Sequence, residues 1–170
     1  RFRGRWSTAA LMLTFALPSS VLAYRSGPPP GVNGSTASFG NSCRVCHGNS
    51  TGSGSVQIIG FPTQYMSGAT YPIQVRVADP IKAGAGFQIS FETPAGVHAG
   101  TMLRTDALNT QLNPPGWLNH TSTGVGNAVA NWTSMGHAAV YNLSWRAPSG
   151  DMGPVTAWAA GNAINNNLAS

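Results

Sequence analysis

The sequence predicts an all-β protein built as an antiparallel β-sandwich, and three observations lead to this prediction. Only 8% of the 170 residues are charged, and glycine (21 residues) and proline (12 residues) are abundant. Ser, Thr and Asn fill the spaces between short apolar runs, a composition typical of loop-rich β proteins and not of helix bundles. From residue 53 onward, apolar and polar residues alternate in short runs separated by turn residues, which is the period of strands.

Residues 1–23 have the pattern of an export signal. Three arginines precede an apolar run over residues 9–17, and Pro18 and small residues up to Ala23 follow it. The stretch is also nearly long enough to cross a bilayer, so we expect either a cleaved signal peptide or an uncleaved transmembrane anchor. In both cases the rest of the chain is expected on the periplasmic side of the bacterial inner membrane, anchored there if the segment is retained and otherwise periplasmic or exported.

Residues 24–42 are rich in Pro, Gly and Ser. Pro28–Pro30 favour polyproline II, and the remaining residues favour loop. Two interpretations are open: a linker between the membrane and the domain, or an ordered strap that lies against whatever the following cysteine loop binds. The predicted organisation is therefore an N-terminal signal or anchor, a linker over 24–42, and one domain over 43–170.

The chain has two cysteines, Cys43 and Cys46, and His47 follows the second directly. A redox-active disulfide normally needs a thioredoxin-like βαβ setting, whereas this motif stands in a loop followed by a β pattern. A structural zinc site needs four ligands, and the other histidines are dispersed along the chain. Both chemistries are weaker interpretations of this motif.

Cys-x-x-Cys-His is the signature of covalent haem attachment. The spacing lets both sulfurs form thioethers with the two vinyl groups of one porphyrin, and the adjacent histidine then lies beneath the iron. We therefore expect one covalent haem c, with Cys43 and Cys46 as its thioether anchors and His47 as the proximal iron ligand. An export context and the absence of any other cysteine agree with this expectation.

Six strands are expected at regular spacing after the cysteine loop. Phe87 and Phe91 alternate with polar residues, as in half-buried strands, and with Trp145 they are expected in the core. The expected strands are 54–61, 71–78, 85–92, 97–104, 139–148 and 153–163, and a seventh strand is compatible with the spacing. Such a series favours an antiparallel sandwich.

A second axial ligand to the iron could come from several places. His120 lies in a stretch expected to be a constrained loop, where Trp117 could wall an apolar haem pocket. Met135 and His137 lie in a second such loop and are its rivals, and an open iron position is a further alternative. The other methionines considered, Met66, Met102 and Met152, are expected to pack in the core.

Charge and composition exclude several functions. Nine Lys and Arg face four Asp and Glu, but three of the basic residues stand at the N-terminus and the rest form no cluster, so nucleic-acid binding is not expected. With four acids in the chain and no nucleophile–histidine–carboxylate spacing, the sequence does not predict an enzyme. No small-molecule substrate is expected.

Four motifs in order carry a family resemblance: "SGPPPGVNGSTASFGNSCRVCHGN", "AGFQISFETPAGVHAG", "WLNHTSTG" and "YNLSWRAPSGDMGPVTAWAAGNAINNN". Together they resemble bacterial exported proteins with a Reeler-like domain, of the choice-of-anchor type, that carry a Cys-x-x-Cys-His motif. The resemblance covers most of the chain after residue 26 and implies an immunoglobulin-like β-sandwich with one haem. A His-Thr pair of that family matches His120 and Thr121, so the resemblance favours His120 as the distal ligand.

The resulting expectation is a periplasm-facing mono-haem c-type cytochrome that transfers single electrons. It would act as an accessory subunit of a respiratory or photosynthetic membrane complex, with redox proteins or other subunits as partners and its N-terminal helix as membrane contact. The alternative is a structural or assembly subunit, in which the sandwich and the N-terminal helix bind neighbouring chains and the haem is a structural staple.

Overall fold

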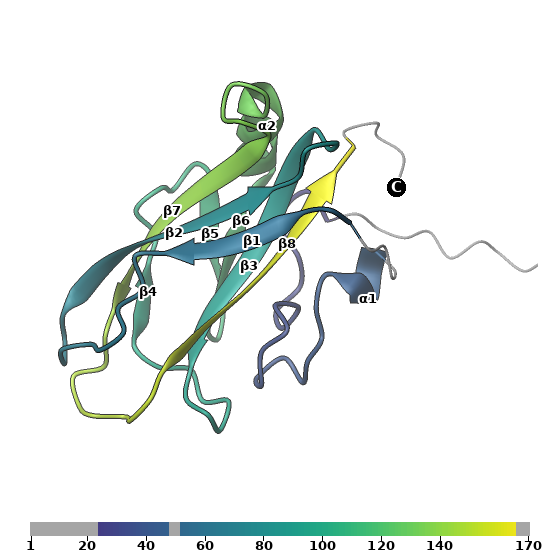
Figure 1. Cartoon of the computed structure of the whole chain (residues 1–170). Helices are drawn as coiled ribbons and strands as arrows, with labels where there is room; N and C mark the ends of the chain where they lie inside the picture. The colour runs from purple at the N-terminus through teal and green to yellow at the C-terminus, as the bar shows by residue number, and fades with distance from the viewer. Residues whose placement is uncertain (1–23, 48–51, 166–170) are drawn as a thin grey trace, which may run out of the picture.

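Two antiparallel sheets pack face to face in the structure, a computed structural model that describes residues 24–47 and 52–165 (Figure 1). The first sheet has the strand order β1-β2-β7-β4 and the second has the order β5-β6-β3-β8. The predicted all-β, immunoglobulin-like antiparallel sandwich is confirmed. The strands are β1 (Ser55–Ile59), β2 (Thr70–Ala78), β3 (Gly84–Glu92), β4 (Thr101–Leu103), β5 (Thr110–Asn113), β6 (Trp117–His120), β7 (Ala138–Arg146) and β8 (Thr156–Ile164).

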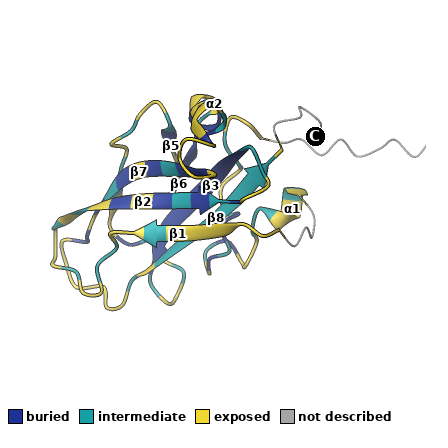
Figure 2. Ribbon diagram, turned by 45° about the horizontal axis from the view of Figure 1, so that its top comes forward, coloured by how far each residue is buried: buried dark blue, intermediate teal, exposed yellow. Residues whose placement is uncertain are grey.

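The first sheet is organised around the long β2–β7 pair. The two strands pair along their whole length, from Thr70 opposite Arg146 to Ala78 opposite Ala138. Side chains alternate across β2 as the sequence predicts, because Val75 is fully buried while its neighbour Gln74 is exposed. β1, at one edge, is exposed over most of its length (Figure 2).

The second sheet is organised around β3, which pairs with β8 over nine residues and with β6 on its other side. Every residue of β3 is buried, so the prediction of a half-buried strand is wrong here. Its apolar residues face the core, and its polar residues face outward but are covered by residues 24–42. The outer face of β3 is therefore shielded from water by packing against residues 24–42, which the alternation of apolar and polar residues in β3 does not reveal.

The core between the sheets is rich in aromatic side chains. Trp145 is fully buried, and its ring centroid lies 5.2 Å from that of Phe91 and 5.3 Å from that of Phe61. Phe87 stacks on Tyr141 at 4.4 Å. Burial of each such side chain contributes about 1.5–3 kcal/mol. The predicted core positions Phe87, Phe91 and Trp145 are confirmed.

The methionine predictions are correct in part. Met102 packs against the core. Met66 and Met152 are 71% and 39% exposed, so their placement in the core is wrong. Both lie in loops, where no alternating pattern directs a side chain inward.

Four elements, α1 (Arg44–His47), β5, β6 and α2 (Ser122–Asn131), were not expected from the sequence. The two strands are only four residues long, and α2 contains Gly124 and Gly126, which are poor helix formers. The helix begins where the Thr121 hydroxyl accepts a hydrogen bond from Gly124 N at 3.0 Å, an N-cap contact. Glycine is required at 124 because a Cβ there would overlap the carbonyl oxygen of Asn109.

Two findings concern the membrane. The predicted signal peptide or anchor, residues 1–23, lies outside the described residues. In the described ranges no helix is both long enough and apolar enough to cross a bilayer.

Candidate functional site: the strap and the cysteine turn

Residues 24–42, called the strap below, lie across the outer face of the second sheet. The Asn113 side chain at the end of β5 donates a hydrogen bond to Pro28 O at 2.9 Å. Further along, the backbone N–H of Val32 donates to Gln88 Oε1 on β3 at 2.7 Å. The strap is thus held by the sheet through polar side chains that would otherwise face solvent.

The second half of the strap, residues 33–42, is called the closed loop because its two ends pair with each other. Asn33 and Ser42 form an antiparallel bridge. Inside the loop the buried hydroxyls of Ser35 and Ser38 bond to each other at 3.2 Å. Such internal hydrogen bonding makes the loop a compact unit of its own, as in Ω-loops.

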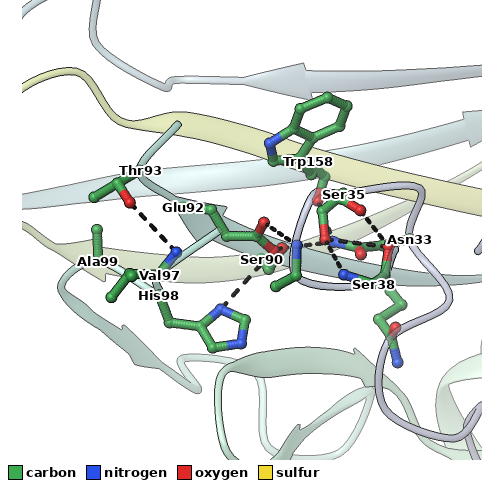
Figure 3. Close-up of polar contacts among 12 residues, drawn as sticks. Asn33, Ser35, Ser38, Ser90, Glu92, Thr93, Val97, His98, Ala99 and Trp158 are labelled. Carbon is green, nitrogen blue, oxygen red and sulfur yellow. Dashed lines mark hydrogen bonds and ion pairs between the residues drawn. The ribbon is translucent and has the colours of Figure 1, made fainter. Parts of the chain in front are cut away.

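Asn33 connects the closed loop to two strands of the second sheet (Figure 3). Its Nδ2 atom donates to Ser90 Oγ on β3 at 2.6 Å and to Trp158 O on β8 at 3.1 Å. Asn33 is 2% exposed, so both contacts are shielded from water. A buried side chain with these contacts fixes where the loop lies on the sheet.

Glu92, at the end of β3, is fully buried beneath the closed loop. Its carboxylate accepts hydrogen bonds from the backbone N–H of Ala37, at 2.9 Å, and from Ser90 Oγ, at 2.5 Å. The Nδ1 atom of His98 lies 3.9 Å from the same carboxylate, which is beyond hydrogen-bond distance (Figure 3). Because a buried carboxylate needs donors, the strap supplies part of what keeps Glu92 in the interior.

The tip of the closed loop presents Phe39 to solvent. The side chain is 92% exposed, the most exposed large apolar side chain of the described residues. The backbone of Phe39 is in the left-handed region, with φ of 53°, and its N–H donates to Thr36 O at 3.0 Å. A well-ordered backbone thus holds an aromatic ring away from the rest of the domain.

The cysteine turn, residues 43–47, follows the closed loop and contains the short helix α1 (Arg44–His47). The sulfur of Cys43 lies 3.9 Å from Val32 O, and burial raises the pKa of this thiol to about 11. Cys43 and Cys46 are free thiols. Burial also lowers the pKa of His47. At neutral pH Cys43 is therefore a protonated thiol and a weak nucleophile.

His120 ends β6 and is buried, whereas the sequence predicted a loop at this position. Its Nδ1 atom accepts a hydrogen bond from Phe87 N at 2.9 Å, and Nε2 lies 3.4 Å from Tyr24 O. The imidazole ring thus accepts a backbone hydrogen bond of β3 that a neighbouring strand would otherwise accept. Gly86 has no side chain, which leaves room for the ring. Burial lowers the pKa of His120, which favours the neutral imidazole that this contact requires.

The other predicted site residues lie elsewhere. The Trp117 ring packs edge-on against His98, with centroids 4.5 Å apart, and lies beside the strap at Gly31. Met135 is 51% exposed, and His137 is exposed in the loop before β7. Neither of these two alternatives to His120 as second axial ligand is buried.

One prediction requires correction. The sequence predicts a metal-binding, haem-iron protein of electron transport with a transmembrane helix, and this description is wrong for the described part of the chain. There, His, Cys, Asp and Glu side chains form no group of three or more that could hold a metal ion, and no helix spans a membrane. The physical reason is that the His120 ring is engaged by the β3 backbone, while Cys43 packs beside the strap.

That correction concerns a metal site formed by grouped side chains of the described residues and a membrane-spanning helix, whereas the assignment of single residues to a haem is a separate prediction. None of these contacts tests covalent haem at Cys43 and Cys46, or His47 and His120 as individual ligands. These assignments stay predictions of the sequence.

Sequence reasoning missed the polar face of β3. The alternation of β3 placed Gln88 and Ser90 on the face opposite the core, which is correct, but such residues are usually solvated. Gln88, Ser90 and Glu92 are all fully buried and hold the strap. The one signal in the sequence was Glu92, an acid at the end of an otherwise uncharged strand.

Comparison with known proteins finds similarity at the level of solved structures. No family model and no curated protein matches the chain. Two crystal structures of the human F-spondin reeler domain match with TM-scores of 0.46: fragment 1 at 19% identity, covering 68% of this chain and 77% of that one, and fragment 2 at 22%, covering 66% and 82%. The Reelin-N domain of F-spondin matches with a TM-score of 0.47 at 22% identity, covering 66% and 75%.

Proposed function

We propose that this domain is a structural or assembly subunit that binds a neighbouring protein chain through Phe39, which enters an apolar pocket of that chain. One observation carries the proposal: a phenylalanine that is 92% exposed stands at the tip of an ordered, anchored loop. Aromatic side chains are enriched at protein interfaces, where they fill pockets of the partner.

The anchoring of the closed loop supports this role. Asn33 joins the loop to β3 and β8, and Glu92 accepts a hydrogen bond from Ala37 in the middle of the loop. An anchor residue held in advance loses little conformational freedom on binding, so more of its burial energy contributes to affinity.

The backbone of Phe39 supports the same role. Non-glycine residues held in the left-handed region cost about 1–3 kcal/mol each and are concentrated at functional positions. The next residue, Gly40, has φ of 75° and adopts this region without penalty. A glycine at 39 would suit the backbone of the loop better than phenylalanine does, so the fold does not require the exposed aromatic ring, and a role in binding accounts for it.

The substitution Phe39→Gly separates binding from folding. We expect the variant to lose at least tenfold in affinity for the assembly, because the anchor ring is removed. Its stability should be unchanged or higher by up to about 1 kcal/mol, because the backbone strain is relieved. Assembly is measured by size-exclusion chromatography of the full chain co-produced with its native neighbours, and stability by urea unfolding.

The matched control is Leu108→Ser, which removes a 70% exposed apolar side chain from the loop between β4 and β5. This variant should assemble as the unmodified chain does. The proposal is wrong if Phe39→Gly co-elutes with the assembly as well as Leu108→Ser does.

A further inference from the structure

Two cavities adjoin at the side of the sandwich where the edge strands β4 and β5 lie in opposite sheets. The first has a volume of about 320 Å³ and is mainly apolar. Its walls come from both sheets and from the hairpin between β5 and β6, and include Phe91, Met102, Leu112, Pro115 and Trp117. Side chains of this kind favour an apolar ligand body.

The second cavity has a volume of about 620 Å³, is more open to solvent than the first and is less apolar. It is lined by Arg146, Met152 and the loop over residues 148–150. Gly100 and Thr101 line both cavities, so the two lie next to each other, and Thr101 between them is exposed. A ligand that passes over Thr101 would therefore extend from the apolar cavity to the arginine.

Arg146 is available to such a ligand. It lies on β7, opposite Thr101 of β4 in the strand register, and its side chain is exposed. Within the described ranges no carboxylate pairs with Arg146, since the single contact between groups of opposite charge type is that of His98 with Glu92. An unpaired guanidinium beside an apolar cavity is complementary to a carboxylate, which it can bind with two parallel hydrogen bonds.

We propose that the two cavities form one binding site for an amphipathic carboxylate. The apolar chain of the ligand occupies the cavity beside Trp117 and Met102, and its carboxylate binds Arg146. This site is distinct from Phe39 and does not depend on the assembly role proposed above.

The test uses decanoate as the probe and the methionine methyl groups as reporters. With 13C-methyl-labelled methionine, decanoate should shift the signals of Met102 and Met152, one in each cavity. The signal of Met135, which lies outside both, should not move. Decanol, which has the same chain without the charge, should bind about tenfold more weakly.

Two variants test the arginine. Arg146→Gln should weaken decanoate binding about fivefold to tenfold and leave decanol binding unchanged, because only the charged contact is lost. Arg76→Gln removes an arginine of the same sheet that lines neither cavity, and it should bind as the unmodified protein does.

The apolar half has its own test. Thr101→Trp places a large side chain where the cavities join and should prevent binding of both probes. Three outcomes would overturn the proposal: equal affinity for decanoate and decanol, equal effects of the two arginine substitutions, or shifts confined to Met135.

Discussion

At the scale of single residues, burial sets the protonation of the two side chains on which the predicted site most depends. Burial raises the pKa of Cys43 to about 11, so this thiol keeps its proton well above neutral pH. His120 stays neutral because burial lowers its pKa, and its Nδ1 atom then accepts the hydrogen bond of Phe87 N. Both residues are therefore uncharged parts of the packed structure.

Alkylation measures the state of Cys43. The Cys46→Ser variant leaves Cys43 as the one thiol that can react. At pH 8 we expect iodoacetamide to modify Cys43 about 100-fold more slowly in the folded protein than in urea. The reason is that a rise in pKa of about two units lowers the thiolate fraction by about that factor. Since the folded pKa lies above the ordinary 9.0, stability should fall as pH rises from 9 to 11. Rates are followed by intact mass.

A second outcome at the cysteines addresses the cofactor. If the exported, unsubstituted protein resists alkylation at both cysteines even in urea and keeps a haem spectrum in pyridine, the prediction of covalent haem is confirmed. If both thiols react fully in urea and no haem is retained, that prediction is wrong.

His120 should make stability depend on pH in the acid range. Because its folded pKa is lowered, the unfolded state binds the proton more readily below about pH 6.5, and stability should fall as the pH decreases from there. The pKa of His47 is lowered too, so this residue also makes stability fall as the pH decreases. His120→Gln should flatten this dependence, whereas the exposed His137→Gln should not. The free energy of unfolding is measured in urea at pH 7.5 and at pH 5. An equal change between these two pH values in both variants would contradict this role of His120.

At the scale of elements, the strap and β3 depend on each other. β3 carries polar residues on its outer face, and these are satisfied by the strap instead of by water. The strap has no strand or helix of its own before α1, and its order comes from these contacts. Hydrogen bonds of buried groups therefore define where the N-terminal segment lies.

Asn33→Ala tests this dependence. The substitution removes the Asn33 donor from Ser90 Oγ and from Trp158 O at a buried position, and should cost about 1–3 kcal/mol of stability. The amides of the closed loop should also exchange with solvent much faster than those of β2 and β7. In the matched control, Asn142→Ala removes an exposed contact with Gln74 and should cost less than about 0.5 kcal/mol. Similar costs for the two variants would contradict the role of Asn33.

At the scale of the whole molecule, Trp145 joins the two sheets. It projects from β7 of the first sheet, stacks on Phe91 of the second, and donates its indole N–H to Ala99 O at 2.9 Å. Its ring also contacts residues of the loop between β1 and β2. One fully buried side chain therefore connects both sheets and two loops.

Trp145→Phe should destabilise the domain by about 2–4 kcal/mol, because it leaves a cavity and an unpaired carbonyl at Ala99. Trp158→Phe, at a half-buried position of β8, should cost less than half as much. Thermal unfolding followed by circular dichroism measures both. Equal losses would show that the sheets do not depend on Trp145 in this way.

The sequence alone was sufficient for the class of fold and for the inner face of the sheets. Alternation placed Phe87, Phe91 and Trp145 in the core because a strand directs successive side chains to opposite faces. The short strands β5 and β6 were missed, since four residues carry too little pattern to detect. α2 was missed because its two glycines lower its helix propensity, and only the structure explains Gly124, by its packing against Asn109.

For the candidate site, the sequence predicted which residues could carry chemistry: Cys43 and Cys46 beside His47, and His120, which lies 73 positions after His47 (120 minus 47). Where these side chains lie and what surrounds them depends on the folded structure. It covers the polar face of β3 with the strap, engages the His120 ring with backbone atoms and exposes Phe39. The physical reason is that local patterns specify which way a side chain points, whereas burial and hydrogen-bond partners depend on segments far apart in the chain.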